Sequence, residues 1–122
     1  MNRLLVVDDD PDILDLLIFK LERAGFDVTS AADGEAAIAA FRAERPDLVV
    51  LDWAMPGADG LEVCAELRRH PETADVPVIL LTARAQEGDL QRGMAASISR
   101  YITKPFSPDE LVRAVRDCLA PV

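Results

Sequence analysis

The segment Pro46–Gly60, PDLVVLDWAMPGADG, decides the fold of this chain. Leu48–Leu51 is a short continuous apolar run, which predicts a strand buried on both faces. Asp52 follows this strand directly, and Asp59 is suited to cap a helix that begins next to it. A carboxylate at the carboxyl end of a central parallel strand occupies the place where open α/β sheets bind their ligands.

Apolar runs and helical patterns alternate along the rest of the chain. Strands are predicted over residues 3–7, 26–31, 78–81 and 98–103, and the 26–31 run is polar enough to be an edge strand. A weak helical pattern, interrupted by two glycines, covers residues 86–96, and four stronger patterns begin after good capping residues: Asp10, Asp33, Asp59 and Ser107. The alternation predicts an α/β fold: a flavodoxin-like, doubly wound, five-stranded parallel sheet of order 2-1-3-4-5 with five helices.

Length and composition fit a single domain over residues 1–122, because a chain of 122 residues that is 50% hydrophobic can bury a core without disulfides or structural metal. We therefore expect Cys64 and Cys118 to be buried thiols. The net charge of −9 argues against binding to nucleic acid or to anionic lipid by this segment. Acidic residues begin at Asp8 and no apolar run approaches the ~20 residues of a membrane span, so we expect a cytoplasmic, soluble domain.

The predicted strand order brings several polar side chains to one edge of the sheet. Asp8 and Asp9 end the first strand and would lie beside Asp52, which ends the third. Three carboxylates so close repel one another, and a hard divalent cation such as Mg²⁺ relieves that repulsion. We expect Asp9 and Asp52 as direct ligands, Asp8 as a ligand directly or through water, and a backbone carbonyl just past Asp52.

Two further side chains at the same edge favour phosphoryl chemistry. Lys104 supplies a compact positive charge and Thr82 a hydroxyl donor, which together with the cation match the charge on a transferring phosphoryl group. Asp52 is then the nucleophile, forming an aspartyl phosphate. Taken singly, each of these residues suits an ordinary turn, cap or surface role, and it is their joint position at four strand ends that predicts a site.

Four motifs in order resemble the receiver domain of two-component response regulators: VVDDD at 6–10, LDWAMPGADG at 51–60, LLTA at 80–83 and YITKPF at 101–106. The resemblance covers essentially the whole chain. It implies a cis peptide bond before Pro105 and assigns family roles to the following residues: metal ligation to Asp8, Asp9, Asp52 and the Ala54 carbonyl, phosphoryl acceptance to Asp52, phosphoryl contacts to Thr82 and Lys104, and switching to Thr82 and Tyr101.

The resemblance also implies a function. A sensor histidine kinase or phosphotransfer protein would donate its phosphoryl group to Asp52 with Mg²⁺, and the domain would not be an enzyme beyond its own phosphorylation and dephosphorylation. Movement of Thr82 and Tyr101 would then change the face formed by residues 86–96, 98–103 and the last helix. An output protein or domain would read that face, through which a homodimer is also possible. Tyr101 is equally compatible with simple packing near the sheet edge.

The chain departs from the family pattern at residues 97–100, SISR, where Gly-Ala and two acidic residues are common in the family. This change removes charged dimer contacts used in one DNA-binding subfamily.

The sequence leaves one alternative function and disfavours two others. A phosphorylation-independent interaction module on the same fold is the alternative. An aspartate-nucleophile phosphatase would need a second acid where Ala54 stands, and a nucleotide-binding protein would need a Gly-rich loop that is missing here.

Overall fold

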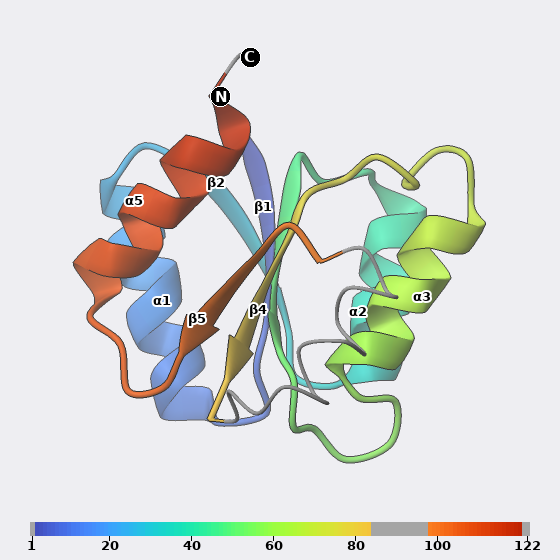
Figure 1. Cartoon of the computed structure of the whole chain (residues 1–122), viewed down its shortest axis with the longest axis horizontal. Helices are drawn as coiled ribbons and strands as arrows, with labels where there is room; N and C mark the ends of the chain where they lie inside the picture. The colour runs from blue at the N-terminus through green and yellow to red at the C-terminus, as the bar shows by residue number, and fades with distance from the viewer. Residues whose placement is uncertain (1, 84–97, 121–122) are drawn as a thin grey trace.

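A computed structural model describes residues 2–83 and 98–120 of the chain (Figure 1). Strands and helices alternate along it. The described elements are β1 (Arg3–Val7), α1 (Pro11–Arg23), β2 (Asp27–Ala31), α2 (Gly34–Ala43), β3 (Leu48–Asp52), α3 (Gly60–Arg69), β4 (Val78–Thr82), β5 (Arg100–Thr103) and α5 (Pro108–Leu119). The helix predicted over residues 86–96 lies outside the described residues.

The five strands form one parallel sheet in the order β2-β1-β3-β4-β5, which confirms the predicted topology. β3 lies at the centre, between β1 and β4, and β2 lies at an edge as its polar sequence predicts. Every residue of β3 and of β4 is buried. These two strands read as continuous apolar runs because helices cover both of their faces.

The four described helices cover the two faces of the sheet (Figure 1). α1 and α5 lie on one face, and α2 and α3 lie on the other. Alternate strand residues point to the two faces, so that Leu4 and Val6 pack with α1 and α5, whereas Leu5 and Val7 pack with α2 and α3. The two apolar layers hold the sheet in a fixed position, and with it the ends of its strands.

The four predicted capping residues begin the four described helices. A side-chain oxygen of each accepts a backbone N–H from the first turn: Asp10 from Asp12 at 3.0 Å, Asp33 from Ala36 at 2.7 Å, Asp59 from Glu62 at 3.0 Å and Ser107 from Glu110 at 3.1 Å. These bonds satisfy N–H groups that have no partner within the helix.

Two strand boundaries were predicted too early. β2 begins at Asp27 rather than at Phe26, because the Phe26 N–H is bonded to the Leu21 carbonyl at the end of α1. β5 begins at Arg100 rather than at residue 98. Just before it, Ser99 contacts Val78 through both backbone and side chain: its N–H donates to the Val78 carbonyl at 2.9 Å, and its hydroxyl accepts the Val78 N–H at 3.0 Å. The regular register with β4 begins one residue later, where Arg100 pairs with Ile79.

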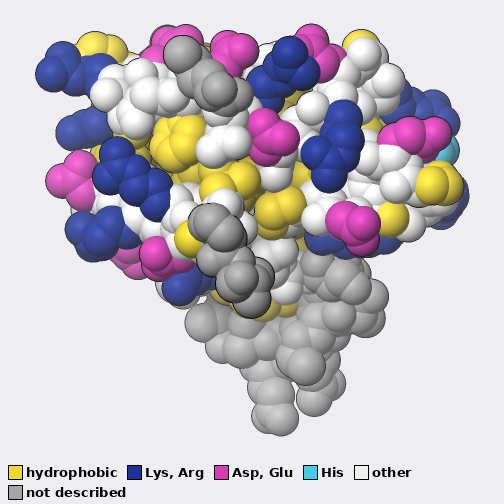
Figure 2. Space-filling view, turned by 90° about the horizontal axis from the view of Figure 1, so that it is seen from above, with side chains coloured by type: hydrophobic (Ala, Val, Ile, Leu, Met, Phe, Trp, Pro, Cys, Tyr) yellow, Lys and Arg dark blue, Asp and Glu magenta, His cyan; other side chains and the backbone are white. Residues whose placement is uncertain are grey.

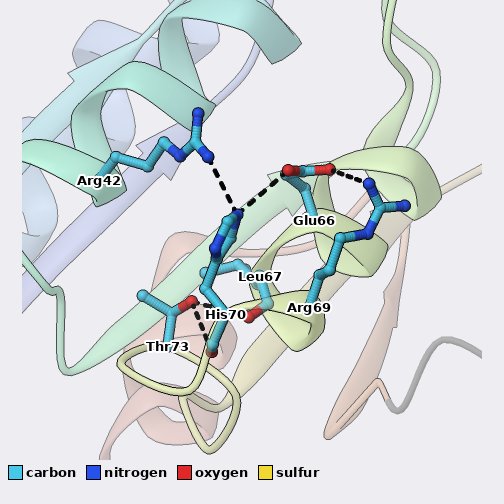
Figure 3. Close-up of polar contacts among 6 residues, drawn as sticks. All are labelled: Arg42, Glu66, Leu67, Arg69, His70 and Thr73. Atoms are coloured by element: carbon cyan, nitrogen blue, oxygen red, sulfur yellow. Dashed lines mark hydrogen bonds and ion pairs between the residues drawn. The ribbon is translucent and has the colours of Figure 1, made fainter.

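α2 and α3 are joined near their carboxyl ends by polar side chains (Figure 3). Nε2 of His70 lies 3.2 Å from Nη2 of Arg42 on α2 and 3.2 Å from Oε1 of Glu66 on α3. The Thr73 hydroxyl donates to the Leu67 carbonyl at 2.7 Å and closes the end of α3. The amino ends of the same two helices lie toward the opposite edge of the sheet, where the candidate site is found.

The cysteines, the surface charges and the character of the helices can each be compared with what the composition predicts. Cys64 is buried, as predicted, whereas Cys118 is only partly buried, and neither is in a disulfide bond. Figure 2, which looks onto the amino ends of the strands, shows basic and acidic side chains interspersed around a central apolar area. That pattern differs from the single-sign basic surface that binds a phosphate backbone. None of the helices in the described part of the chain has the length and apolar character that spanning a bilayer requires.

Candidate functional site

The carboxyl ends of four strands bring the predicted polar side chains to one edge of the sheet. Val7 pairs with Leu51 across β1 and β3, so the next residues, Asp8 and Asp52, are neighbours. Thr82 ends β4, beside the strand that ends at Asp52. The Lys104 N–H, just past β5, donates to the Thr82 carbonyl at 2.8 Å. The predicted convergence of these residues is therefore present in the structure.

Three carboxylates form the centre of the site. One oxygen from each of Asp8, Asp9 and Asp52 lies within 4.8 Å of the others. Asp8 and Asp52 are only 1% and 5% exposed, whereas Asp9 is exposed to solvent. Oδ1 of Asp8 accepts the N–H of Asp10 at 2.9 Å, but its buried Oδ2 accepts no hydrogen bond from the described residues. Three hard oxygen donors with an unsatisfied buried oxygen among them fit a divalent cation such as Mg²⁺.

Lys104 partly neutralises this cluster. Its Nζ lies 3.0 Å from Oδ1 of Asp52 and 3.8 Å from Oδ2 of Asp8. The side chain reaches the carboxylates while remaining about a quarter exposed. One ammonium among three carboxylates leaves an excess of negative charge at this edge.

The pKa values of the two buried carboxyls reflect that excess. Burial raises the pKa of Asp52 above its ordinary value, and the charges of Asp8 and Asp9 add to the rise, against the hydrogen bond and charge of Lys104. Burial also raises the pKa of Asp8, against the N–H of Asp10 and the charge of Lys104. The folded protein therefore holds these carboxylates at a cost, which a bound cation would offset.

A pocket of about 540 Å³ opens beside Asp52. One wall is the loop that follows β3, including Trp53 and the exposed Ala54, and the other contains Thr82 and Lys104. Thr82 is buried, at 3% exposure, although it lines this pocket. The pocket has room for a phosphoryl group bordered by Asp52, Thr82 and Lys104.

Tyr101, the predicted switch residue, lies on β5 and is partly buried against the layer that contains Cys64. Burial raises the pKa of its phenol. The Lys104–Pro105 peptide bond is cis, as the family resemblance implies. The movement of Tyr101 and the metal-binding role of the Ala54 carbonyl stay predictions.

An apolar groove beside the site was not predicted from the sequence. It has a volume of about 390 Å³ and lies between α1 and the loop after β5, with Ile13, Leu16 and Phe106 in its lining. Lys104 lines both this groove and the pocket at Asp52. Leu16 and Phe19 are the exposed large hydrophobics of the described residues, at 47% and 54%. Their position outside the inward stripe of α1 was the available signal.

Known proteins are similar to this chain in sequence and in fold. Residues 4–116 match the family described as the response regulator receiver domain. The chain is 42% identical over 115 residues to the phosphate regulon transcriptional regulatory protein PhoB of Escherichia coli strain K12, an alignment that covers 94% of this chain and 50% of PhoB. The chain spans about half the length of the curated relatives it matches.

Two solved structures are similar to this chain over nearly their whole length. The chemotaxis protein CheY4 of Vibrio cholerae superposes with a TM-score of 0.92 at 30% identity, covering 96% of this chain and 98% of CheY4. The receiver domain of the sensor histidine kinase PA1611 of Pseudomonas aeruginosa PAO1 superposes with a TM-score of 0.88 at 31% identity, covering 97% of each chain. That structure is described as having a magnesium ion coordinated in its active-site cleft.

Proposed function

The chain belongs to the response regulator receiver domain family of two-component signal transduction, and we propose that Asp52 is its phosphoacceptor. The observation that carries the proposal is the contact of Lys104 Nζ with Asp52 Oδ1 at 3.0 Å, inside a cluster of three carboxylates that fits a cation. This arrangement would place a nucleophile and a positive charge for phosphoryl oxygens in one pocket, beside carboxylates that could hold a metal ion. Residues 1–122 then act as a single receiver domain.

The proposed reaction transfers a phosphoryl group from a phosphohistidine of a sensor kinase or phosphotransfer protein. An oxygen of Asp52 forms a bond to phosphorus as the P–N bond to the donor imidazole breaks and its electron pair stays on the ring nitrogen. The Lys104 ammonium and the Thr82 hydroxyl line the same pocket and are suited to contact phosphoryl oxygens. Ala54 stands where an aspartate-nucleophile phosphatase would carry its general acid, so the proposed role of the domain is that of an acceptor and not of an enzyme that turns over an external substrate.

The donor set at the site fits Mg²⁺. Asp9, Asp52 and the Ala54 carbonyl would hold the ion, with Asp8 contributing directly or through water. When bound, Mg²⁺ supplies positive charge that offsets the carboxylates and the phosphoryl oxygens. The magnesium described in the cleft of the PA1611 receiver domain supports this choice of ion.

Signalling would follow from a shift between two states of the domain. Thr82 would move toward the phosphoryl group, Tyr101 would turn inward behind it, and the face that includes β5 and α5 would change. An output protein or domain would read that face, and a homodimer through it is possible. Several relatives are named as transcriptional regulators, which makes control of transcription a reasonable output.

A protein phosphodonor also accounts for the apolar groove beside the site. The groove between α1 and the loop after β5 shares Lys104 with the pocket at Asp52, and Leu16 and Phe19 add exposed apolar surface on α1. Apolar side chains at the entrance to a charged pocket suit docking of a protein that carries the phosphohistidine.

Fluorescence of Trp53, the single tryptophan, tests the proposal because this residue adjoins Asp52 in the chain and lines the pocket. We expect a change on adding Mg²⁺ and a second change on adding beryllofluoride, a phosphoryl analogue. Asp52→Asn should abolish the second change, while the control Asp75→Asn, on an exposed loop, should keep both. Absence of both changes in the wild-type protein would favour the phosphorylation-independent interaction module.

A further inference from the structure

The first residue of α2 packs directly against the loop that forms one wall of the pocket. Gly34 is buried, and a Cβ atom at this position would overlap the carbonyl oxygen of Ala58 and lie 2.7 Å from the Ala58 Cβ. The obstacle includes backbone, so a change of side-chain rotamer cannot relieve it. α2 and the loop after β3 therefore touch at a distance that only glycine permits.

Neither the backbone nor the helix requires glycine at position 34. Its φ angle lies outside the left-handed region, in contrast to Gly57 at φ +74°. The helix is already capped by Asp33, and alanine is the better helix former. The close approach to Ala58 is then the physical reason for a glycine here.

The loop contacted by Gly34 has little freedom to absorb a displacement. The loop leaves β3 after Asp52 and ends at Gly60, the first residue of α3. The Gly60 N–H donates to the Trp53 carbonyl at 3.0 Å, which ties the two ends of the loop together. A Cβ at Gly60 would lie 2.8 Å from the Asp52 carbonyl oxygen, so the start of α3 is also pressed against the strand end. Movement at Ala58 must therefore be taken up within residues 53–59, which include Ala54.

We propose that Gly34 is a positioning residue for the metal site: by letting α2 approach Ala58, it sets where the loop holds the Ala54 carbonyl. The inference rests on the proposed function, in which that carbonyl is a Mg²⁺ ligand. Mg²⁺ demands near-ideal octahedral geometry, so a small shift of one ligand lowers its affinity. Glu35 adds to the contact, because its carboxylate lies 3.1 Å from the place of a Cβ at Gly57 in the same loop.

The test is a Mg²⁺ titration of Gly34→Ala followed by Trp53 fluorescence, with urea unfolding in EDTA as a measure of stability. We expect Mg²⁺ affinity to fall about tenfold, the scale on which residues that orient metal ligands act. The matched control is Ala39→Gly, which weakens the same helix at an exposed position without adding atoms near the loop. This control should lose stability and keep its Mg²⁺ affinity.

Two further variants approach the contact from the loop. Ala58→Val enlarges the side chain that faces Gly34 and should also weaken Mg²⁺ binding, so it decides the matter if Gly34→Ala does not fold. Ala58→Gly, added to Gly34→Ala, removes one of the two overlaps and should restore part of the affinity. If the wild type binds Mg²⁺ and the folded variants bind it as tightly as Ala39→Gly does, the positioning role is wrong. If the wild type itself does not bind Mg²⁺, the proposed function fails instead.

Discussion

Replacing Asp52, the proposed phosphoacceptor, by its uncharged isostere Asn should make the metal-free protein more stable. Asp52 is 5% exposed and its pKa is raised first of all by burial. At an effective dielectric constant near 20, the attraction of Lys104 at 3.0 Å is about 5.5 kcal/mol, and the repulsion by one carboxylate is about 3.5 kcal/mol at 4.8 Å, the upper limit of the separations between the oxygens of the cluster. Asp8 and Asp9 both repel Asp52, so on this scale the two repulsions together exceed the single attraction by about 1.5 kcal/mol, less what solvent screening removes from the exposed Asp9, and the burial penalty adds to this cost. Asp52→Asn keeps an oxygen for the Lys104 hydrogen bond, so we expect a gain of about 1–2 kcal/mol.

The assay is urea unfolding of wild type and Asp52→Asn at neutral pH in EDTA. The comparison requires that the unfolding free energy of both proteins depends on urea concentration with the same slope. Asp75→Asn removes the same charge from an exposed loop and controls for relief of the net charge of −9. Its unfolding free energy should change by less than about 0.5 kcal/mol. A loss of stability in Asp52→Asn would show that the Lys104–Asp52 pair is worth more than the crowding and burial of the carboxylate, and would refute this account of the site.

Three other predictions follow from the same geometry. Folding raises the pKa values of Asp8 and Asp52 above 3.8, so each carboxylate destabilises the folded protein at pH values above its folded pKa. This destabilisation disappears as the pH falls toward 3.8. The difference in unfolding free energy between Asp52→Asn and wild type should therefore shrink when urea unfolding is measured at progressively lower pH. Mg²⁺ at about 100 times its dissociation constant should raise the unfolding free energy of wild type by about 2.7 kcal/mol, and Asp9→Asn should reduce this gain at the same concentration. Leu16→Ala with Phe19→Ala should slow phosphoryl transfer from a cognate histidine kinase but not from phosphoramidate, a small donor; equal slowing with both donors would contradict the docking role of the groove.

Local sequence patterns predicted the fold well because they correspond to local physical constraints. Asp10 and Ser107 could be identified as caps because each stands before a Pro and an apolar helical stripe, and both accept first-turn N–H groups in the structure. The errors at Phe26 and at residue 98 have a different origin. Both residues are apolar and suit a strand by composition, but the Phe26 N–H is bonded to the end of α1, and the Ser99 hydroxyl that follows residue 98 accepts the Val78 N–H through a side chain.

The candidate site was predictable only so far as strand order determines it. Once β1 and β3 are neighbours, residues one beyond paired positions must meet, and Asp8 and Asp52 do so. The contact of Gly34 with Ala58 could not be predicted in this way, because it depends on how closely a helix on one face approaches a loop at the edge. The groove lined by Leu16 depends likewise on the path of the chain after β5, which no periodicity specifies.

The excess of negative charge links the stability of this domain to its binding of ions. Each carboxylate that could ligate Mg²⁺ also repels its neighbours in the metal-free protein, and one ammonium is too little to offset three acids. A substitution that removes one acid should therefore stabilise the metal-free state while weakening Mg²⁺ binding, so the two effects should have opposite signs across Asp8, Asp9 and Asp52. A variant at Gly34 should behave differently: it alters no charge, so it should lose both stability and Mg²⁺ affinity. Comparison of the two groups separates the part of metal affinity that comes from charge from the part that comes from the position of the loop.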